Sequence, residues 1–491
     1  MLFNSINFLI FFPVVTTLYF LLPHKIRWML LLAASCFFYI SFVPIFILIL
    51  AFTITVDYFA GLAIEGAVGK RKLHYLIASI VANVGVLFVF KYFDFFNQNL
   101  SALADFLHWN YSLETLALIL PIGLSFHTFQ SLSYTIEVYR GKQKAERHLG
   151  IFALYVMFYP QLVAGPIERP QNLLHQFRER HTVEIERISS GLALMLYGFF
   201  KKLVIADNLA PFVNLVYAAP DGYSGIALLI ATIFFAFQIY CDFSGYSDIA
   251  IGSARVMGFN LMRNFNHPYF SRSIGEFWRR WHRSLSTWFR DYVYIPLGGS
   301  RVPTTLLVRN IFITFLLSGF WHGANWTYVI WGALNGGFLA AAHLTRNIRP
   351  PLPNNKIFGI LRALFQTLFT FALICLAWVY FRAETLVDAN MIVGKILTDW
   401  YTVGEQFATS SFLASQIFLG GSPYDFYWCL VVIGILLGAE ALQEYGRMPK
   451  IFSRERPKTT ALLTWFVVAT ALLLIIVLSR SDSSQFIYFQ F

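Results

Sequence analysis

Apolar segments of membrane-spanning length recur along the whole chain and restrict the fold it can adopt. A helix needs about 20 predominantly apolar residues to cross the hydrocarbon core, where its backbone groups have to bond one another. Segments of this kind predict an all-α polytopic membrane protein. The predicted spans lie near residues 5–22, 28–42, 44–62, 76–93, 114–138, 150–164, 188–206, 224–242, 308–320, 326–344, 358–381, 426–444 and 461–479.

Three of these segments, 28–42, 150–164 and 308–320, are short for a span, so we expect some of them to be re-entrant or broken. The composition agrees with a membrane location, because only 13% of the residues are charged, against about 25% in soluble proteins. The net charge of +11 is attributed to cytoplasmic connections and not to nucleic-acid binding. The four cysteines lie in apolar stretches without zinc-ligand spacing, so neither disulfides nor a metal site are expected.

Basic residues orient the first half of the chain. Lys25 and Arg27 follow the first predicted span, and residues 70–72 are all basic and follow the third. The connection 94–113 contains no Lys or Arg, whereas basic residues return at 140–147. Since basic connections face the cytoplasm, this alternation places the N-terminus outside. The first apolar run lacks a basic region before it and is expected to be a retained span rather than a signal peptide.

His322 is an ionisable residue within the run Gly319–Trp326 of an otherwise apolar region. Such residues are costly at bilayer depth and usually face a protein-lined cavity where they have a function. The neighbouring glycines permit close approach, and imidazole exchanges protons near neutral pH. No metal-ligand spacing or nucleophilic-serine motif involves it. We predict a catalytic role for His322, with a structural hydrogen bond to a carbonyl as the alternative.

Residues 277–292 combine aromatic residues with arginines. The large apolar residues recur at intervals of 3, 4, 3 and 4, which predicts one face of an α-helix. The segment is either an amphipathic helix at the membrane surface or a buried helix that lines a cavity for an anionic or polar ligand. His282 borders the aromatic face. The apolar positions are Trp278, Trp281, Leu285, Trp288 and Tyr292, and the basic ones are Arg279, Arg280, Arg283 and Arg290.

Three further segments interrupt apolar runs. Asp242 and Asp248 enclose glycine and serine residues, which predicts either the capping of a broken helix or ion pairs with the nearby arginines. Three prolines in Tyr159–Pro170 predict the end of a helix. For His127 we expect a structural hydrogen bond.

Several motifs, taken in order, resemble those of the membrane-bound O-acyltransferases. The resemblance covers nearly the whole chain, and its most specific part is the pair of Trp-His segments. The motifs are Met1–Ser5, Pro121–Phe126, Gln161–Ile167, Asp242–Asp248, Phe277–His282, Ser284–Trp288, Gly319–Ala324, Trp378–Ala383 and Phe486–Phe491.

The resemblance implies a bundle of about 11–13 membrane helices with re-entrant segments around a central tunnel. It implies a single domain over residues 1–491, a catalytic core in 114–344 and additional spans in 345–491. In that family the positions of His322 and His282 are catalytic. We assign substrate binding to Arg279, Arg280, Trp278, Trp281, Ser286, Trp321 and Asn325, and supporting roles to Asp242, Asp248, Gln161 and Gly165.

The resemblance further implies an acyltransferase that moves a group from a thioester to a hydroxyl. We expect O-acetyl transfer from a cytoplasmic donor, acetyl-CoA or an acyl carrier protein, toward an extracellular or periplasmic polysaccharide such as alginate. The expected location is the bacterial cytoplasmic (inner) membrane, and no bound cofactor or metal is expected. Expected partners are a periplasmic acetyltransferase and the polysaccharide synthesis machinery.

The mechanism predicted from these residues uses His322 as a general base. His282, Asn325 or a backbone N–H near Gly323 would stabilise the oxyanion, and a transient acyl-histidine is the variant. Two other functions stay open. One is D-alanyl or other acyl transfer to a cell-wall polymer. The other is transport or lipid flipping without covalent chemistry, which would predict inverted repeats that the sequence does not show.

Overall fold

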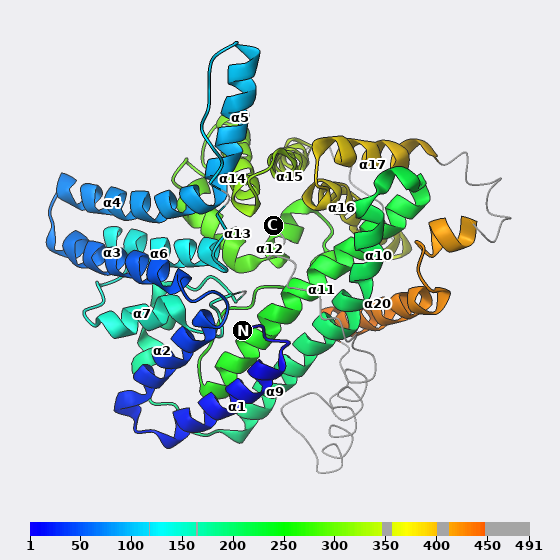
Figure 1. Ribbon diagram of the computed structural model, residues 1–491. Helices are drawn as coiled ribbons and strands as arrows, with labels where there is room; N and C mark the ends of the chain where they lie inside the picture. The colour runs from blue at the N-terminus through cyan, green and yellow to red at the C-terminus, as the bar shows by residue number, and fades with distance from the viewer. Residues whose placement is uncertain (117, 164, 346–355, 400–411, 447–491) are drawn as a thin grey trace. The chain divides into compact units, whose positions relative to one another are not determined.

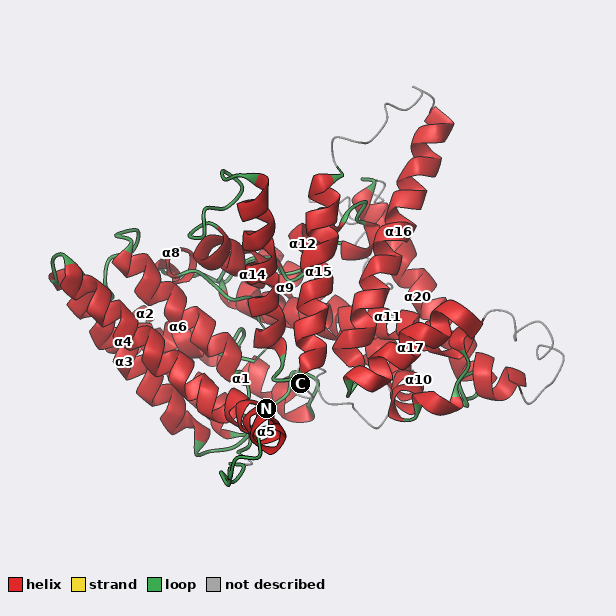
Figure 2. Cartoon of the chain, turned by 90° about the horizontal axis from the view of Figure 1, so that it is seen from above, coloured by secondary structure: helices red, strands yellow, loops and turns green. Residues whose placement is uncertain are grey.

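The structure is a computed structural model that describes residues 1–116, 118–163, 165–345, 356–399 and 412–446 (Figure 1). In this part of the chain every regular element is a helix and no strand occurs (Figure 2). The predicted all-α fold class is therefore confirmed.

The chain divides into two compact units. The first contains the described residues of 1–195 and 246–263, and the second contains residues 196–245 and the described residues of 264–446. Helix α11 (Gly225–Met257) contributes to both, because the division falls after Gly245.

In the first unit, helices α3, α4 and α6 pack side by side, and both views show them aligned (Figures 1 and 2). The helices of this unit are α1 (Ile6–Leu21), α2 (His24–Ile40), α3 (Phe46–Gly66), α4 (Lys70–Leu87), η1 (Phe88–Tyr92), α5 (Phe93–Phe106), α6 (Leu124–Tyr139), α7 (Leu149–Met157), α8 (Pro170–Leu173), η2 (His175–Arg178) and most of α9 (Ile185–Phe199).

In the second unit, α14 and α15 form an antiparallel hairpin, and α16 packs against α15. Its helices, besides the first part of α11, are η3 (Phe200–Ala206), α10 (Asp207–Ala218), η4 (Pro220–Gly222), η5 (Pro268–Phe270), α12 (Ile274–Arg280), α13 (Arg283–Phe289), η6 (Arg290–Tyr294), α14 (Thr304–His322), α15 (Trp326–Leu344), α16 (Lys356–Arg382), α17 (Leu386–Thr398), η9 (Leu413–Ile417) and α20 (Pro423–Glu444).

Seven helices within the described residues are long and apolar enough to cross a membrane, which makes this a multi-pass membrane protein. The predicted total of about 11–13 spans stays a prediction, because the expected span 461–479 lies outside the described residues. The seven helices are Phe46–Gly66, Lys70–Phe106, Ile185–Ala218, Gly225–Met257, Thr304–His322, Ile357–Arg382 and Pro423–Glu444.

Two of the three short apolar segments remain short in the structure. α2 has 17 residues, and α7 has only nine before the proline-containing turn that follows it, as the prolines predicted. The segment 308–320 is different, because it extends to the 19 residues of α14 and is long enough to span.

The predicted helix break at Asp242–Gly252 is wrong, because α11 continues through it to Met257. The glycines of this segment allow close packing against a neighbouring helix and do not end α11. A Cβ atom at Gly245 would lie 2.8 Å from the carbonyl oxygen of Gly198, and one at Gly252 would lie 2.6 Å from that of Gly191. Both carbonyls belong to α9, so glycine is what lets the backbones of α9 and α11 approach so closely.

Candidate functional site

His322 is the last residue of α14, and a loop of three residues leads from it to α15. Two glycines set how closely the two helices approach. A Cβ atom at Gly319 would overlap the carbonyl oxygen of Tyr328, and one at Gly332 would overlap that of Phe315. The backbone contact fixes the end of α14 and therefore the position of the histidine.

Three aromatic rings surround the imidazole of His322, which is only 7% exposed. The ring centroids of Trp321, Trp331 and Phe381 lie 4.7, 5.0 and 5.2 Å from that of the histidine, and all three contacts are T-shaped. Phe381 comes from α16, so three helices contribute to this environment. The rings restrict the rotation of the imidazole and keep bulk water from most of its surface.

The second predicted histidine lies at a break that the sequence did not predict. The 3-4 periodicity of residues 277–292 predicted one continuous helix, but α12 ends at Arg280 and α13 begins at Arg283. His282 between them has a φ of +40°, in the left-handed region. Asn264 stabilises this break from outside the segment, since its carbonyl accepts a hydrogen bond from the Arg283 N–H at 2.8 Å. Its side-chain oxygen also accepts one from the Ser284 hydroxyl at 2.9 Å.

His282 is 1% exposed and packs against aromatic rings of its own unit. Its ring centroid lies 4.6 Å from that of Phe243 and 6.4 Å from that of Phe265. Burial lowers the pKa of His282 to about 3, because the charged imidazolium would lose its hydration. At neutral pH this residue is therefore an uncharged imidazole that can donate one hydrogen bond and accept another.

Trp321 connects the two predicted catalytic histidines. Its ring centroid is 6.5 Å from that of His282 and 4.7 Å from that of His322. The structure thus brings both histidines into one aromatic cluster, although 40 residues separate them along the chain. Their exposure to a common tunnel stays a prediction.

The aromatic side of residues 277–292 faces the interior of the second unit. Trp281, Leu285 and Trp288 are 2%, 3% and 6% exposed. The ring of Trp281 lies 5.1 Å from that of Trp378. Burial of these side chains favours the interpretation as a helical segment inside the protein over that of a helix on the membrane surface.

Trp278 belongs to the same cluster, with its ring centroid 5.6 Å from that of Trp331, one of the rings around His322. Its indole nitrogen is buried and has no hydrogen-bond partner among the described residues. A buried indole N–H normally finds a partner, so this donor is available to a substrate acceptor group.

The predicted substrate-binding arginines are placed differently from one another. Arg280 forms ion pairs at 2.7 Å with Glu276 in its own helix and with Glu444 at the end of α20. Arg279 and Arg283 are exposed. Arg280 therefore forms ion pairs within the protein. Substrate binding by Arg279 and Arg280 stays a prediction.

Ser286 and Asn325 both bond to nearby backbone. The hydroxyl of Ser286 donates to the carbonyl of Trp281 at 3.1 Å, across the break between α12 and α13. Asn325 caps α15, since its side-chain oxygen accepts from the Thr327 N–H at 3.0 Å. Its amide nitrogen donates to the carbonyl of Glu384 at 3.0 Å. The bonds of Asn325 hold the loop after His322. Substrate contacts by either residue stay predictions.

A buried ion cluster includes Asp242, the residue that precedes Phe243 in α11. The ammonium group of Lys202 lies 2.8 Å from a carboxylate oxygen of Asp242 and 2.9 Å from one of Asp207. The cation beside Asp242 is thus a lysine, where the sequence had suggested an arginine. The sequence signal for this lysine is the Lys201-Lys202 pair within an apolar run, which had not been predicted to form an ion pair.

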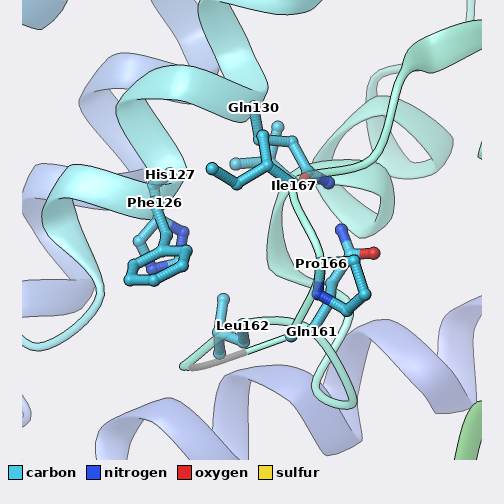
Figure 3. Close-up of a pocket in the computed structure, with 9 residues that line it drawn as sticks. Phe126, His127, Gln130, Gln161, Leu162, Pro166 and Ile167 are labelled. Carbon is cyan, nitrogen blue, oxygen red and sulfur yellow. The ribbon is translucent and has the colours of Figure 1, made fainter. Parts of the chain in front are cut away.

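The remaining predicted supporting residues belong to the first unit. Asp248 lies in the part of α11 assigned to it. Gln161 and Gly165 line a small cavity together with His127, with about 10 Å³ of room for the centre of a water molecule (Figure 3). His127 hydrogen bonds to the backbone of Val156, as expected of a structural histidine.

In the residues that the structure describes, no group of three or more His, Cys, Asp or Glu side chains is placed to hold a metal ion. The chemistry of the aromatic cluster is that of two imidazoles and an indole N–H in surroundings that exclude water. Such groups are suited to moving a proton and to binding a developing negative charge.

Comparison with known proteins agrees with this chemistry. The sequence model of the membrane-bound O-acyltransferase family matches residues 147–382, which include both histidines. The probable alginate O-acetylase AlgI of Azotobacter vinelandii is 43% identical over 82% of this chain and 79% of its own length. The protein of the same name from Pseudomonas putida is 37% identical over 100% of both chains. The peptidoglycan O-acetyltransferase of Helicobacter pylori is 36% identical over 80% of this chain and 79% of its own length.

The chain belongs to the membrane-bound O-acyltransferase family and is an O-acyltransferase.

Proposed function

We propose that this protein transfers an acetyl group from a cytoplasmic thioester toward the hydroxyls of an extracellular polysaccharide, with alginate as the first candidate acceptor. The names of two of the similar proteins support acetyl as the group and alginate as the acceptor. The Helicobacter pylori relative is named for peptidoglycan at comparable identity, so the acceptor has to be tested directly.

The observation that carries the proposal is the placement of His322 among three aromatic rings, within one cluster with His282. In the proposed reaction His322 takes the proton of an acceptor hydroxyl while that oxygen attacks the thioester carbonyl. The C–S bond then breaks, and the imidazolium returns the proton to the leaving thiolate. General base catalysis of this kind contributes about 10²–10⁴-fold.

The uncharged state of His282 supports a different role for the second histidine. With a pKa lowered to about 3, it stays neutral through the physiological range and has one N–H to donate. We assign that N–H to the oxyanion that forms on the carbonyl carbon. Trp321, which contacts both rings, would hold the two histidines at a fixed separation.

The donor is proposed to be acetyl-CoA or an acylated carrier protein, both of which carry phosphate groups next to the thioester arm. The exposed Arg279 and Arg283 lie on either side of the buried Trp281-His282 break and offer positive charge to such a donor. For the acceptor side we propose a periplasmic acetyltransferase partner that receives the group. The location is the bacterial inner membrane.

The test compares His322→Ala with His343→Ala, a control on α15 whose histidine is exposed. Each variant is produced at equal level in a polysaccharide-secreting host that lacks the native gene, and polymer acetylation is measured by NMR. We expect His322→Ala to lose acetylation and the control to retain it. Acetylation retained in His322→Ala would contradict the proposed mechanism.

The same strains distinguish the alternatives when labelled donors are supplied. Label from acetate in the polymer supports acetyl transfer. D-alanine in a cell-wall polymer would support D-alanyl transfer, and movement of a substrate without any covalent label would support a transporter.

A further inference from the structure

Helix α5 runs across the helices beside it instead of continuing along them. α4 has 18 residues and so is about 27 Å long, which nearly covers the hydrocarbon thickness of about 30 Å. The five-residue π-helix η1 follows, and there the chain turns sharply into α5. Both views show the turn: α5 stands across α4 in Figure 1 and is seen nearly end-on in Figure 2.

One side of α5 is covered by the segment that follows the helix. The side chain of Asn97 donates to the carbonyl of Leu113 at 3.1 Å and accepts from the Tyr111 hydroxyl at 2.6 Å. The carboxylate of Asp94 accepts from the Leu116 N–H at 2.8 Å. Asn97 is consequently buried at 5% exposure. These bonds fix which face of the helix points inward.

About a third of a turn away, four large apolar side chains form an exposed stripe, here named the α5 stripe. The spacing of its members is 4, 3 and 4 residues, which places them on one helical face. Two polar residues, Gln98 and Asp105, lie on nearly the opposite face and are also exposed. The α5 stripe consists of Phe96 (42% exposed), Leu100 (49%), Leu103 (49%) and Leu107 (41%).

We propose that α5 lies in the outer surface of the lipid bilayer, with the α5 stripe in the acyl-chain region and Gln98 and Asp105 in water. A helix that runs across spanning helices, just after one of them has crossed, lies along the membrane surface. The helix before it, α4, also has exposed apolar side chains, since Val81 and Val84 are 64% and 45% exposed. Amphipathic helices bind at this depth through such a face.

Two features of the sequence place the helix on the outer side. Residues 93–120 contain no Lys or Arg, as expected for a connection that does not face the cytoplasm. Trp109 follows the helix and is 67% exposed, and tryptophan favours the headgroup region of a membrane. The lipid interface also explains why four large apolar side chains remain uncovered by protein.

The proposal is tested by spin labels on the full-length protein. Single cysteines replace Leu100, Leu103, Gln98 or Asp105 in a variant whose four native cysteines are serine. Each protein is reconstituted into vesicles of phosphatidylethanolamine and phosphatidylglycerol. Collision with oxygen, which concentrates in lipid, is compared with collision with a water-soluble nickel chelate by electron paramagnetic resonance.

We expect oxygen to dominate at Leu100→Cys and Leu103→Cys and the nickel chelate to dominate at Gln98→Cys and Asp105→Cys. Access of the nickel chelate at all four positions would overturn the proposal and leave the stripe open to water and to a protein partner. Access of oxygen at all four would equally overturn it, because α5 would then lie inside the bilayer. The outcome does not depend on which acyl group the enzyme transfers.

Discussion

The indole N–H of Trp278 is a donor that the folded protein leaves unused within its described residues. Trp278→Phe keeps an aromatic ring against Trp331 and removes the indole N–H together with part of the ring system. We expect kcat for acetyl transfer to fall by about 10²-fold, as when one donor to an oxyanion is lost, while KM changes little. Initial rates with labelled donor in proteoliposomes measure both constants.

A matched control for this prediction is Trp326→Phe, because Trp326 is 50% exposed. It should keep the parent kcat. If Trp278→Phe also keeps the parent kcat, its N–H does not contact the reacting group, and Trp278 serves only in packing.

Lys202 holds two carboxylates inside the second unit, with its own side chain fully buried. Lys202→Met leaves Asp207 and Asp242 buried without this cation. Removing one partner of a buried ion pair costs about 3–5 kcal/mol, so we expect a clearly lower midpoint of thermal unfolding in detergent. Adding Asp207→Asn and Asp242→Asn to this variant should restore most of the loss. A single variant as stable as the parent would show that the cluster is not structural.

At the scale of residues, the sequence predicted a functional residue where an ionisable side chain lies in an apolar segment. A histidine in an apolar run was enough to predict His322, whereas the role of His282 was predicted from the family resemblance. The structure places both histidines in one cluster. The ion partners were not predictable in the same way. Arg280 pairs with Glu444, which lies 164 residues later, and no local pattern reports a contact at that separation.

At the scale of elements, the crossing of α14 and α15 depends on the missing side chain of Gly332. Gly332→Ala would force a Cβ atom against the carbonyl oxygen of Phe315. We expect a loss of stability of about 1–3 kcal/mol from overpacking, and lower activity because the end of α14 carries His322. Thermal unfolding and acetyl transfer are measured on the same preparation.

Gly337 provides the control in the same helix. A Cβ atom there would meet only the ring edge of Phe312, at 3.9 Å. Gly337→Ala should therefore keep the stability and activity of the parent. Equal behaviour of the two variants would contradict the view that this crossing positions the histidine.

The spacing of apolar residues predicted where helices form better than it predicted where they are interrupted. It placed a helix through residues 277–292, but the chain turns at His282 because Asn264, 18 residues earlier, bonds the next turn. Conversely, Gly and Ser residues after Asp242 suggested a break, and the structure uses them for the close contact of α9 and α11. In both places a contact with a residue distant in the sequence determines whether the helix is interrupted, so a local pattern could not predict it.

At the scale of the whole molecule, the arrangement of basic residues predicts which loops face which side. Val68 is 86% exposed next to the basic residues 70–72, and Trp109 is 67% exposed after α5. In a background without native cysteines, Trp109→Cys should react with a membrane-impermeant maleimide in spheroplasts, whereas Val68→Cys should react only after the membrane is opened. The reverse pattern would invert the predicted topology and place the N-terminus inside.

The ion pair between Arg280 and Glu444 has a consequence for biosynthesis. Glu444 also lies 3.2 Å from the imidazole of His267, so the end of α20 is bonded to two points in the segment that leads to His282. The ribosome makes this glutamate long after both histidines, and it lies beyond residue 382, where the match to the family model ends. A nascent chain therefore contains both histidines before the contacts that hold α12 exist, and the site can be completed only late in synthesis.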